Sequence, residues 1–280
     1  MLRVLIATDL SPAADLALQR AIAFASANGA SLRVVHVTAL GTPESERAAL
    51  RERLHQRWRE LAPPDLVEAG FAVPTGNPIE TILAEADICE PDLIVLGAHG
   101  KMRLRDAWLG TTAEQIMRRA TVPVLVVRRA AGEPYRRVLA AVDDTTVAED
   151  VLRLACRISG ATDVFAVHAF HVPFGAFVGG DQVHQDVEAE HRRAIETLVA
   201  EIAPAAGSVS VHPMVREGEP FGVIAEAVRE LEPDLLVLGT HGRRGIAAAL
   251  VDSVAEGALD YFDLDMMVLR TGGGESLTEL

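Results

Sequence analysis

The sequence has only two cysteines among its 280 residues, Cys89 and Cys156, one in each half. So few thiols exclude a disulfide-rich scaffold, and they provide no Cys-x-x-Cys pair for a metal. We interpret both residues as small apolar members of a core. The cysteine content therefore points away from covalently cross-linked and cysteine-ligated metal folds.

Long apolar runs are also missing. Apolar residues make up 49% of the chain, yet no stretch of them reaches the roughly 20 residues that a membrane-spanning helix needs. The segment 1–9 meets an acidic residue, Asp9, after a few apolar ones and shows no signal-peptide cleavage site. We therefore expect a soluble, cytoplasmic protein without a membrane span.

Positive charge is scarce relative to negative charge. Lys and Arg number 26 against 40 Asp and Glu, which gives a formal charge of −14, and no dense basic run offsets it locally. Such a surface repels the phosphate backbone of DNA and RNA. Nucleic-acid partners are therefore not expected.

An internal repeat divides the chain into two similar halves. Segment 4–9 is echoed by 138–143, and segment 90–97 returns almost unchanged as 232–239. The offset between the copies is smaller at the first two apolar runs than from the Gly-x-Pro segment onward. This difference predicts an insertion of about ten residues in the second copy, around 173–180, where glycines and single aromatic residues suit an irregular loop.

The length of the chain agrees with two domains, since a single domain usually has roughly 100–200 residues. The polar junction 128–134 contains Gly132 and Pro134, which are typical of a linker. We therefore predict one domain over 1–131, a second over 132–270, and a glycine-containing tail over 271–280.

Within each copy, apolar runs of strand length alternate with segments of helical spacing. In the first copy the predicted strands are 4–7, 32–37, 67–73, 93–96 and 124–127. The predicted helices are 14–27, 44–61, 79–89 and 112–119. This order is typical of a doubly wound, Rossmann-like α/β domain with a five-stranded parallel sheet covered on both faces. Such a sheet binds ligands at the carboxyl ends of its strands.

A glycine-rich turn follows the fourth predicted strand of the first copy. It reads Gly97-Ala98-His99-Gly100, then nine residues, then Gly110-Thr111-Thr112 at the start of a helix. Glycine permits unusual backbone angles and lets a phosphate approach the main chain, and the N–H groups at a helix start favour an anion. The two threonine hydroxyls can add hydrogen bonds. The turn therefore predicts a phosphate site.

The spacing Gly-x-x-Gly, nine residues, Gly-Ser/Thr resembles the ATP-binding signature of the universal stress protein family. Similar features are Thr8-Asp9-Leu10-Ser11 after the first strand, Val35-His36-Val37 in the second, and the closing segment 122–127. The resemblance covers both copies. It implies two Rossmann-like domains that pack about a pseudo-twofold axis, with the closing strands 124–127 and 266–269 near the contact.

By this resemblance the first copy would bind ATP, with Mg, as its cofactor. The implied cofactor-binding residues are Thr8, Asp9, Val37, Leu96, Gly97, Gly100, Gly110, Thr111 and Thr112. Asp9 would contact the ribose or adenine, Val37 would flank the base, and the glycines and threonines would hold the phosphates. From the residues alone, Asp9 is an equally good candidate for a helix cap together with Ser11.

The second copy departs from the signature. After Gly239-Thr240-His241-Gly242 and nine residues, Asp252-Ser253 stands where the first copy has Gly110-Thr111. A carboxylate at a phosphate position opposes triphosphate binding. We therefore expect that the second copy does not bind ATP in the same manner and serves a structural or regulatory role, or another ligand.

The second copy is also rich in histidine. His184 and His191 lie seven residues apart on a predicted helix, and His168 and His171 lie at the end of a predicted strand. A zinc site is one interpretation, but the spacing lacks the tight ligand set of known zinc sites, so surface histidines are favoured and no metal is predicted.

No catalytic residue emerges from the sequence. There is no P-loop lysine, so at most a weak ATPase is expected, and segment 8–12 lacks the glycine-rich pyrophosphate loop of ATP-using ligases. The favoured hypothesis is an ATP-binding stress or signalling regulator whose nucleotide occupancy is read by a protein partner. The alternative is a nucleotide-free interaction scaffold. Association of two chains into a homodimer stays open.

Overall fold

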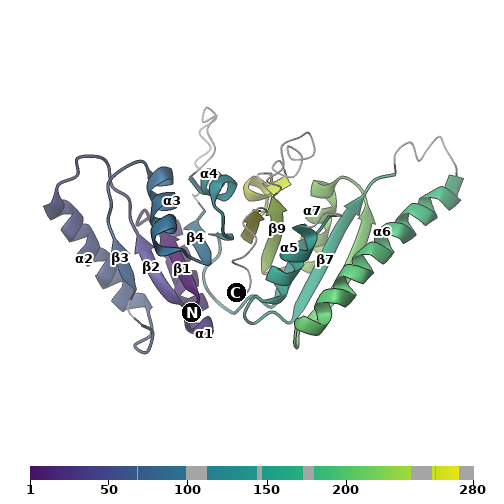
Figure 1. The fold of residues 1–280 in the computed structure, drawn as a ribbon, viewed down its shortest axis with the longest axis horizontal. Helices are drawn as coiled ribbons and strands as arrows, with labels where there is room; N and C mark the ends of the chain where they lie inside the picture. Colours follow the sequence, from purple (N-terminus) through teal and green to yellow (C-terminus); the bar gives the residue numbers. More distant parts are fainter. Residues whose placement is uncertain are drawn as a thin grey trace. The chain divides into compact units, whose positions relative to one another are not determined.

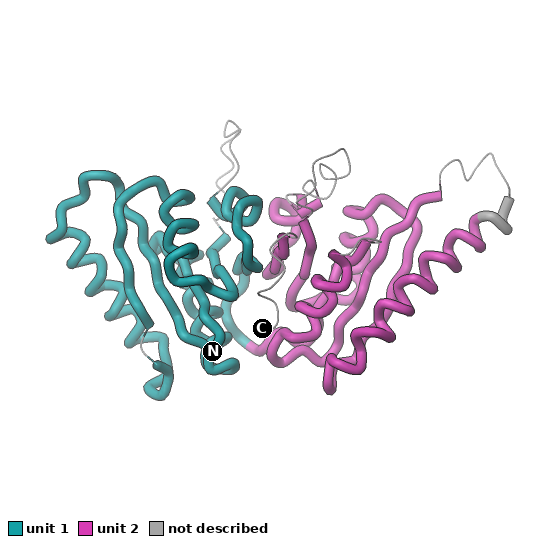
Figure 2. Tube along the Cα trace, viewed as in Figure 1, with its two compact units in different colours: residues 1–132, 272–280 teal, residues 133–271 magenta. Residues whose placement is uncertain are grey.

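The computed structural model describes residues 1–67, 69–98, 112–143, 147–172, 180–240, 254–255 and 257–270. The chain splits into two compact units, Met1–Gly132 and Glu133–Thr271 (Figure 2). Each unit has a parallel sheet with helices packed against it (Figure 1). Within the described part, no helix has the length and apolar character needed to span a membrane.

The first unit is a five-stranded parallel sheet in the order β3-β2-β1-β4-β5. Its strands are β1 (Arg3–Ala7), β2 (Ser31–Val35), β3 (Gly70–Ala72), β4 (Leu93–Gly97) and β5 (Val124–Val127). Its helices are α1 (Pro12–Asn28), α2 (Glu44–Leu61), α3 (Pro78–Cys89) and α4 (Thr112–Arg119). The strand order reverses direction between β1 and β4, and a doubly wound sheet opens a crevice at such a point.

The second unit repeats this design with the order β10-β9-β6-β7-β8, again parallel. Its strands are β6 (Arg137–Ala141), β7 (Asp163–Phe170), β8 (Ser210–Glu217), β9 (Leu235–Thr240) and β10 (Asp265–Arg270). Its helices are α5 (Val147–Cys156), α6 (Gly180–Ile202), the short 3-10 helix η1 (Ala203–Ala205) and α7 (Pro220–Leu231). The predicted fold class, two Rossmann-like domains in tandem, is confirmed.

The central strands are buried on both faces, which explains why their sequences are continuously apolar rather than alternating. Leu5 and Ile6 of β1, Leu93 and Val95 of β4, and Leu125 of β5 have no exposed surface. Burial on this scale is the main stabilising contribution to each unit, at roughly 25 cal/mol per Å² of apolar surface.

All strands and helices predicted for the first copy are present, but two strands are shorter than expected. The predictions were 32–37 and 67–73, whereas β2 ends at Val35 and β3 covers only Gly70–Ala72. The pairing continues beyond these ends as separate bonds, from the His36 amide to the Ala72 carbonyl at 3.0 Å and from the Thr38 amide to the Pro74 carbonyl at 2.9 Å. β3 is an edge strand and Pro74 has no N–H to extend its ladder. The predicted insertion falls largely on 173–179, outside the described residues.

The near-identical repeat Glu-Pro-Asp anchors the start of each sheet. The Asp92 carboxylate accepts a hydrogen bond from the Arg3 amide at 2.7 Å, and the Asp92 amide donates to the Arg3 carbonyl at 2.8 Å. In the second unit the Asp234 carboxylate accepts from the amides of Arg136 and Arg137 at 2.9 and 2.8 Å. These bonds lie at the amino ends of the central strands, opposite to the end where a ligand is expected, so the strongest repeat in the sequence has a structural role.

Candidate functional site

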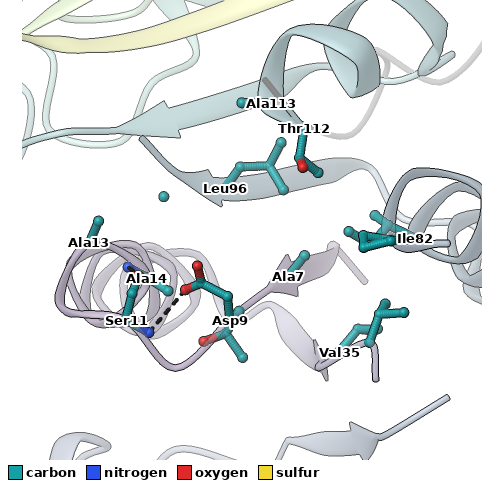
Figure 3. Close-up of a pocket in the computed structure, with 14 residues that line it drawn as sticks. Ala7, Asp9, Ser11, Ala13, Ala14, Val35, Ile82, Leu96, Thr112 and Ala113 are labelled. Atoms are coloured by element: carbon teal, nitrogen blue, oxygen red, sulfur yellow. Dashed lines mark hydrogen bonds between the residues drawn. The ribbon is translucent and has the colours of Figure 1, made fainter. Parts of the chain in front are cut away.

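A cavity of about 170 Å³ lies in the first unit at the carboxyl ends of β1, β2 and β4 (Figure 3). It also borders the first turns of α1, α3 and α4. Its lining consists of Ala7, Thr8, Asp9, Ser11, Ala13, Ala14, Val35, Val37, Pro78, Ile82, Leu96, Gly97, Thr112 and Ala113. This is the crevice that the reversal of strand order predicts.

The cavity brings together most of the residues that the sequence implied for the cofactor. The predicted residues in its lining are Thr8, Asp9, Val37, Leu96, Gly97 and Thr112. Gly100, Gly110 and Thr111 lie outside the described residues, as do His99 and the segment between them. The apolar lining also includes Ile82 of α3, which the sequence did not single out. Ile82 lies outside the glycine-rich turn, so no local motif could have indicated it.

The turn between β1 and α1 places the Asp9 side chain at the cavity wall. The Asp9 carboxylate accepts a hydrogen bond from the Ser11 amide at 2.9 Å, and the Ser11 hydroxyl accepts from the Ala14 amide at 3.2 Å, which caps α1. Between them Leu10 has a φ of 63°, a left-handed conformation that costs a non-glycine residue about 1–2 kcal/mol. Ser11 is therefore the cap of α1, and Asp9 holds this cap residue through its amide. A strained residue at a cavity is consistent with a functional turn.

His36 holds the same turn from the neighbouring strand. Its Nδ1 lies 2.8 Å from the Thr8 carbonyl, and because a carbonyl only accepts, Nδ1 carries the proton and donates. In the second unit the matching His168 donates from Nδ1 to the Val142 carbonyl at 3.0 Å. The repeated histidine thus ties the ends of two adjacent strands together, a role that the sequence did not reveal.

Gly97 has a packing role that the sequence analysis missed. A Cβ at this position would lie 2.7 Å from the Ala13 carbonyl oxygen and 2.9 Å from the Ala14 amide nitrogen. Gly97 is also absent from the described residues with positive φ. Its glycine is therefore required for the close approach of α1 to β4. The expectation that Gly97 uses backbone angles closed to other residues was wrong, although the residue does line the cavity.

The chemistry of the lining is divided between one polar side and one apolar side. The Asp9 carboxylate and the hydroxyls of Thr8, Ser11 and Thr112 provide hydrogen-bonding groups. Val35, Val37, Ile82 and Leu96 form an apolar wall. The described lining contains no Lys or Arg, so an anionic group here would depend on backbone N–H groups, such as those at the start of α4 where Thr112 lies.

Two histidines of the second unit, His168 and His191, form a pair. His168, which is buried, has its Nε2 3.0 Å from Nδ1 of His191, and His184 lies 3.4 Å from the Glu217 carboxylate. His171 is exposed. Over the residues that the structure describes, no cluster of three or more His, Cys, Asp or Glu could hold a metal ion.

Comparison with known proteins places this geometry in a family. The model of the family described as "Universal stress protein family" matches residues 1–128 and again 134–270. The chain is 26% identical to universal stress protein E of Salmonella typhi over 273 residues, which cover 87% of this chain and 84% of that protein. It is 33% identical to a universal stress protein of Mycolicibacterium smegmatis over 139 residues, 45% of this chain and 46% of that protein.

A solved structure shows the same fold over the whole chain. The universal stress protein from Archaeoglobus fulgidus DSM 4304 has a TM-score of 0.71 at 17% identity, covering 98% of this chain and 97% of that chain. The fold, the family match in each half and the similarity to universal stress protein E over most of both chains agree. The chain therefore belongs to the universal stress protein family, as a member with two domains in tandem.

Proposed function

We propose that the first unit binds ATP in the cavity beside Asp9 and acts as a nucleotide-dependent stress or signalling regulator. The observation that carries this proposal is the convergence of a carboxylate, an apolar wall and a helix start in one cavity. The Asp9 carboxylate can accept hydrogen bonds from ribose hydroxyls. Val37 and Leu96 offer apolar surface to a base, and the N–H groups at the start of α4 favour phosphate.

Mg would accompany the phosphates, and the glycine and threonine residues 97, 100 and 110–112 would hold them. No general base with an orienting partner stands in the described lining of the cavity, so the proposed role of the nucleotide is regulatory, with at most slow hydrolysis. Occupancy would be read through the surface around the cavity by a protein partner. The second unit would contribute structure or regulation.

Calorimetric titration of ATP with Mg into the nucleotide-stripped full chain tests the proposal. We expect about one ATP per chain in the wild type and none in Ile82→Trp, because a larger side chain from α3 would fill the cavity. Ile224→Trp places the same change at the matching position of α7 in the second unit and should leave ATP binding intact. Asp9→Asn keeps an acceptor for the Ser11 amide, so the turn is retained while affinity should fall about tenfold.

Absence of ATP binding by the wild type would refute the proposal and favour a nucleotide-free scaffold. Hydrogen exchange of the wild type with and without ATP then tests the regulatory part. We expect altered protection around the β1–α1 turn and α4 that is absent in Ile82→Trp. Unchanged exchange despite binding would contradict regulation through this surface.

A further inference from the structure

The second unit has a cavity at the position that matches the first site. It lies at the carboxyl ends of β6, β7 and β9 and has a volume of about 320 Å³, compared with about 170 Å³ in the first unit. The repeat aligns Asp143 with Asp9, Ile224 with Ile82 and Gly239 with Gly97, and all of these residues line their cavities. The duplication has therefore kept a cavity in each unit.

Two threonines that line the first cavity are replaced by valine in the second. Val142 stands where the first unit has Thr8, and Val254 stands where it has Thr112. The described lining of the second cavity contains no Ser or Thr. Within the described lining a nucleotide would meet no side-chain hydroxyl, and desolvating its polar atoms against valine methyl groups is costly.

The second cavity also has a different shape. Ala169 of β7 replaces Val37, the residue expected to flank a base, and this smaller side chain contributes to the larger volume. On the other wall Phe221, near the start of α7, replaces Ile79 and lines the cavity. Its ring is supported by Phe262 at 5.6 Å and Tyr261 at 5.3 Å between centroids. A supported aromatic ring of this kind offers an edge or face to another ring.

Charge in the described lining of the second cavity is of one sign. Its only ionisable side chains are the carboxylates of Asp143, which is half-buried, and Glu219, which is exposed. Glu219 replaces Asn77, whose side chain caps α3 by accepting from the Ile79 and Glu80 amides, whereas Glu219 makes no side-chain cap bond to α7. Two carboxylates beside an apolar cavity repel phosphate and carboxylate ligands and attract cations.

We propose that the second unit binds an apolar, ring-bearing small molecule with a cationic head, such as an arylalkylamine. The apolar body fills the space between Ala169, Ile224 and Phe221, and the ammonium group lies toward Asp143 and Glu219. The volume is at the lower end of the range for small-molecule pockets, roughly 300–1,000 Å³, which suits one or two rings. This inference stands on the second unit alone and does not depend on ATP binding by the first.

Two naphthalene probes with head groups of opposite charge test the proposal on the full chain. They are 2-naphthylmethylamine and 2-naphthoate, and naphthalene fluorescence anisotropy with calorimetry measures their binding. We expect about one amine per chain and at least tenfold weaker binding of the acid. Glu219→Gln changes an exposed side chain and should reduce the preference for the amine over the acid several-fold.

The reciprocal tryptophan variants locate the site. Ile224→Trp should abolish amine binding and keep ATP binding, and Ile82→Trp should do the reverse. Ala169→Phe fills the cavity from the opposite wall and replaces Ile224→Trp as the test variant if Ile224→Trp does not fold. The proposal is overturned if no amine binds, if amine and acid bind equally well, or if amine binding survives both filling variants. Amine binding without ATP binding by the wild type would refute only the function proposed for the first unit.

Discussion

Replacing Gly97 by alanine adds one methyl group where α1 packs on β4. The contacts of this methyl group determine how much the free energy of unfolding falls. The new Cβ would lie 2.7 Å from the Ala13 carbonyl oxygen and 2.9 Å from both the Ala13 carbonyl carbon and the Ala14 amide nitrogen. All three are backbone atoms, so no side chain can rotate away and α1 itself must move. Overpacking in a tight core costs roughly 1–3 kcal/mol, and we expect the upper part of this range.

Urea unfolding in the absence of nucleotide measures this cost. Both tryptophans, Trp58 and Trp108, belong to the first copy, so tryptophan fluorescence follows the first unit selectively. With a denaturant slope of roughly 1–3 kcal/mol per M urea, we expect the unfolding midpoint of Gly97→Ala to fall by about 1 M. Gly132→Ala is the control, because a Cβ there meets nothing within 4 Å among the described residues.

The matching glycine of the second unit provides a second control. A Cβ at Gly239 would lie 2.5 Å from Cγ1 of Val147, which is a side-chain atom. Val147→Ala should therefore recover part of the stability lost in Gly239→Ala, as followed by circular dichroism, whereas no side-chain truncation can rescue Gly97→Ala. If Gly97→Ala unfolds at the wild-type midpoint but loses ATP binding, the glycine serves only the ligand and the packing explanation is refuted.

Two further predictions concern the anchoring aspartate and the thiols. Asp92→Ala removes the carboxylate that accepts from the Arg3 amide at 2.7 Å, and loss of a charged hydrogen bond at this buried position should cost the first unit roughly 1.5–3 kcal/mol in the same urea assay. Asp92→Asn retains an acceptor, and equal loss in both variants would contradict this role. Burial raises the pKa of the Cys156 thiol to about 11, so about one thiol in a thousand is ionised at pH 8. A thiol-specific disulfide reagent should label the less buried Cys89 first. In a Cys89→Ser chain the labelling of Cys156 should be slow at pH 8, and its rate should rise about tenfold per pH unit up to about pH 11. Rapid labelling of that variant at pH 8 would show that Cys156 is not buried.

The order of strands and helices was predictable because it depends on local patterns. A central strand covered on both faces must be apolar at every position, and a helix on its surface must be apolar on one side, so β1, β4, β5 and helices such as α2 are visible in the sequence. The ends of β2 and β3 were not predictable to the residue. At the sheet edge, the ladder stops where individual hydrogen bonds stop, and residues such as Pro74 decide this.

Most of the candidate site was predictable for the same reason, since parallel strands bring their carboxyl ends to one edge of the sheet. Asp9, Val37 and Leu96 lie at the ends of predicted strands, Thr112 begins a predicted helix, and all four line the cavity. The wall residue Ile82 was not predicted. It belongs to α3, whose position over the cavity depends on how the helix crosses the sheet and not on any spacing along the chain.

Tertiary structure alone decided what the repeated residues do. Gly97 is a glycine because the backbone of α1 lies 2.7 Å from where a Cβ would be, and His36 and His168 are histidines that bond to the carbonyl group after a neighbouring strand. The two cavities also differ in chemistry through substitutions spread over several elements, such as Thr8 to Val142. These roles depend on distances between residues far apart in the chain. A local pattern carries no such distances, so only the packed chain reveals them.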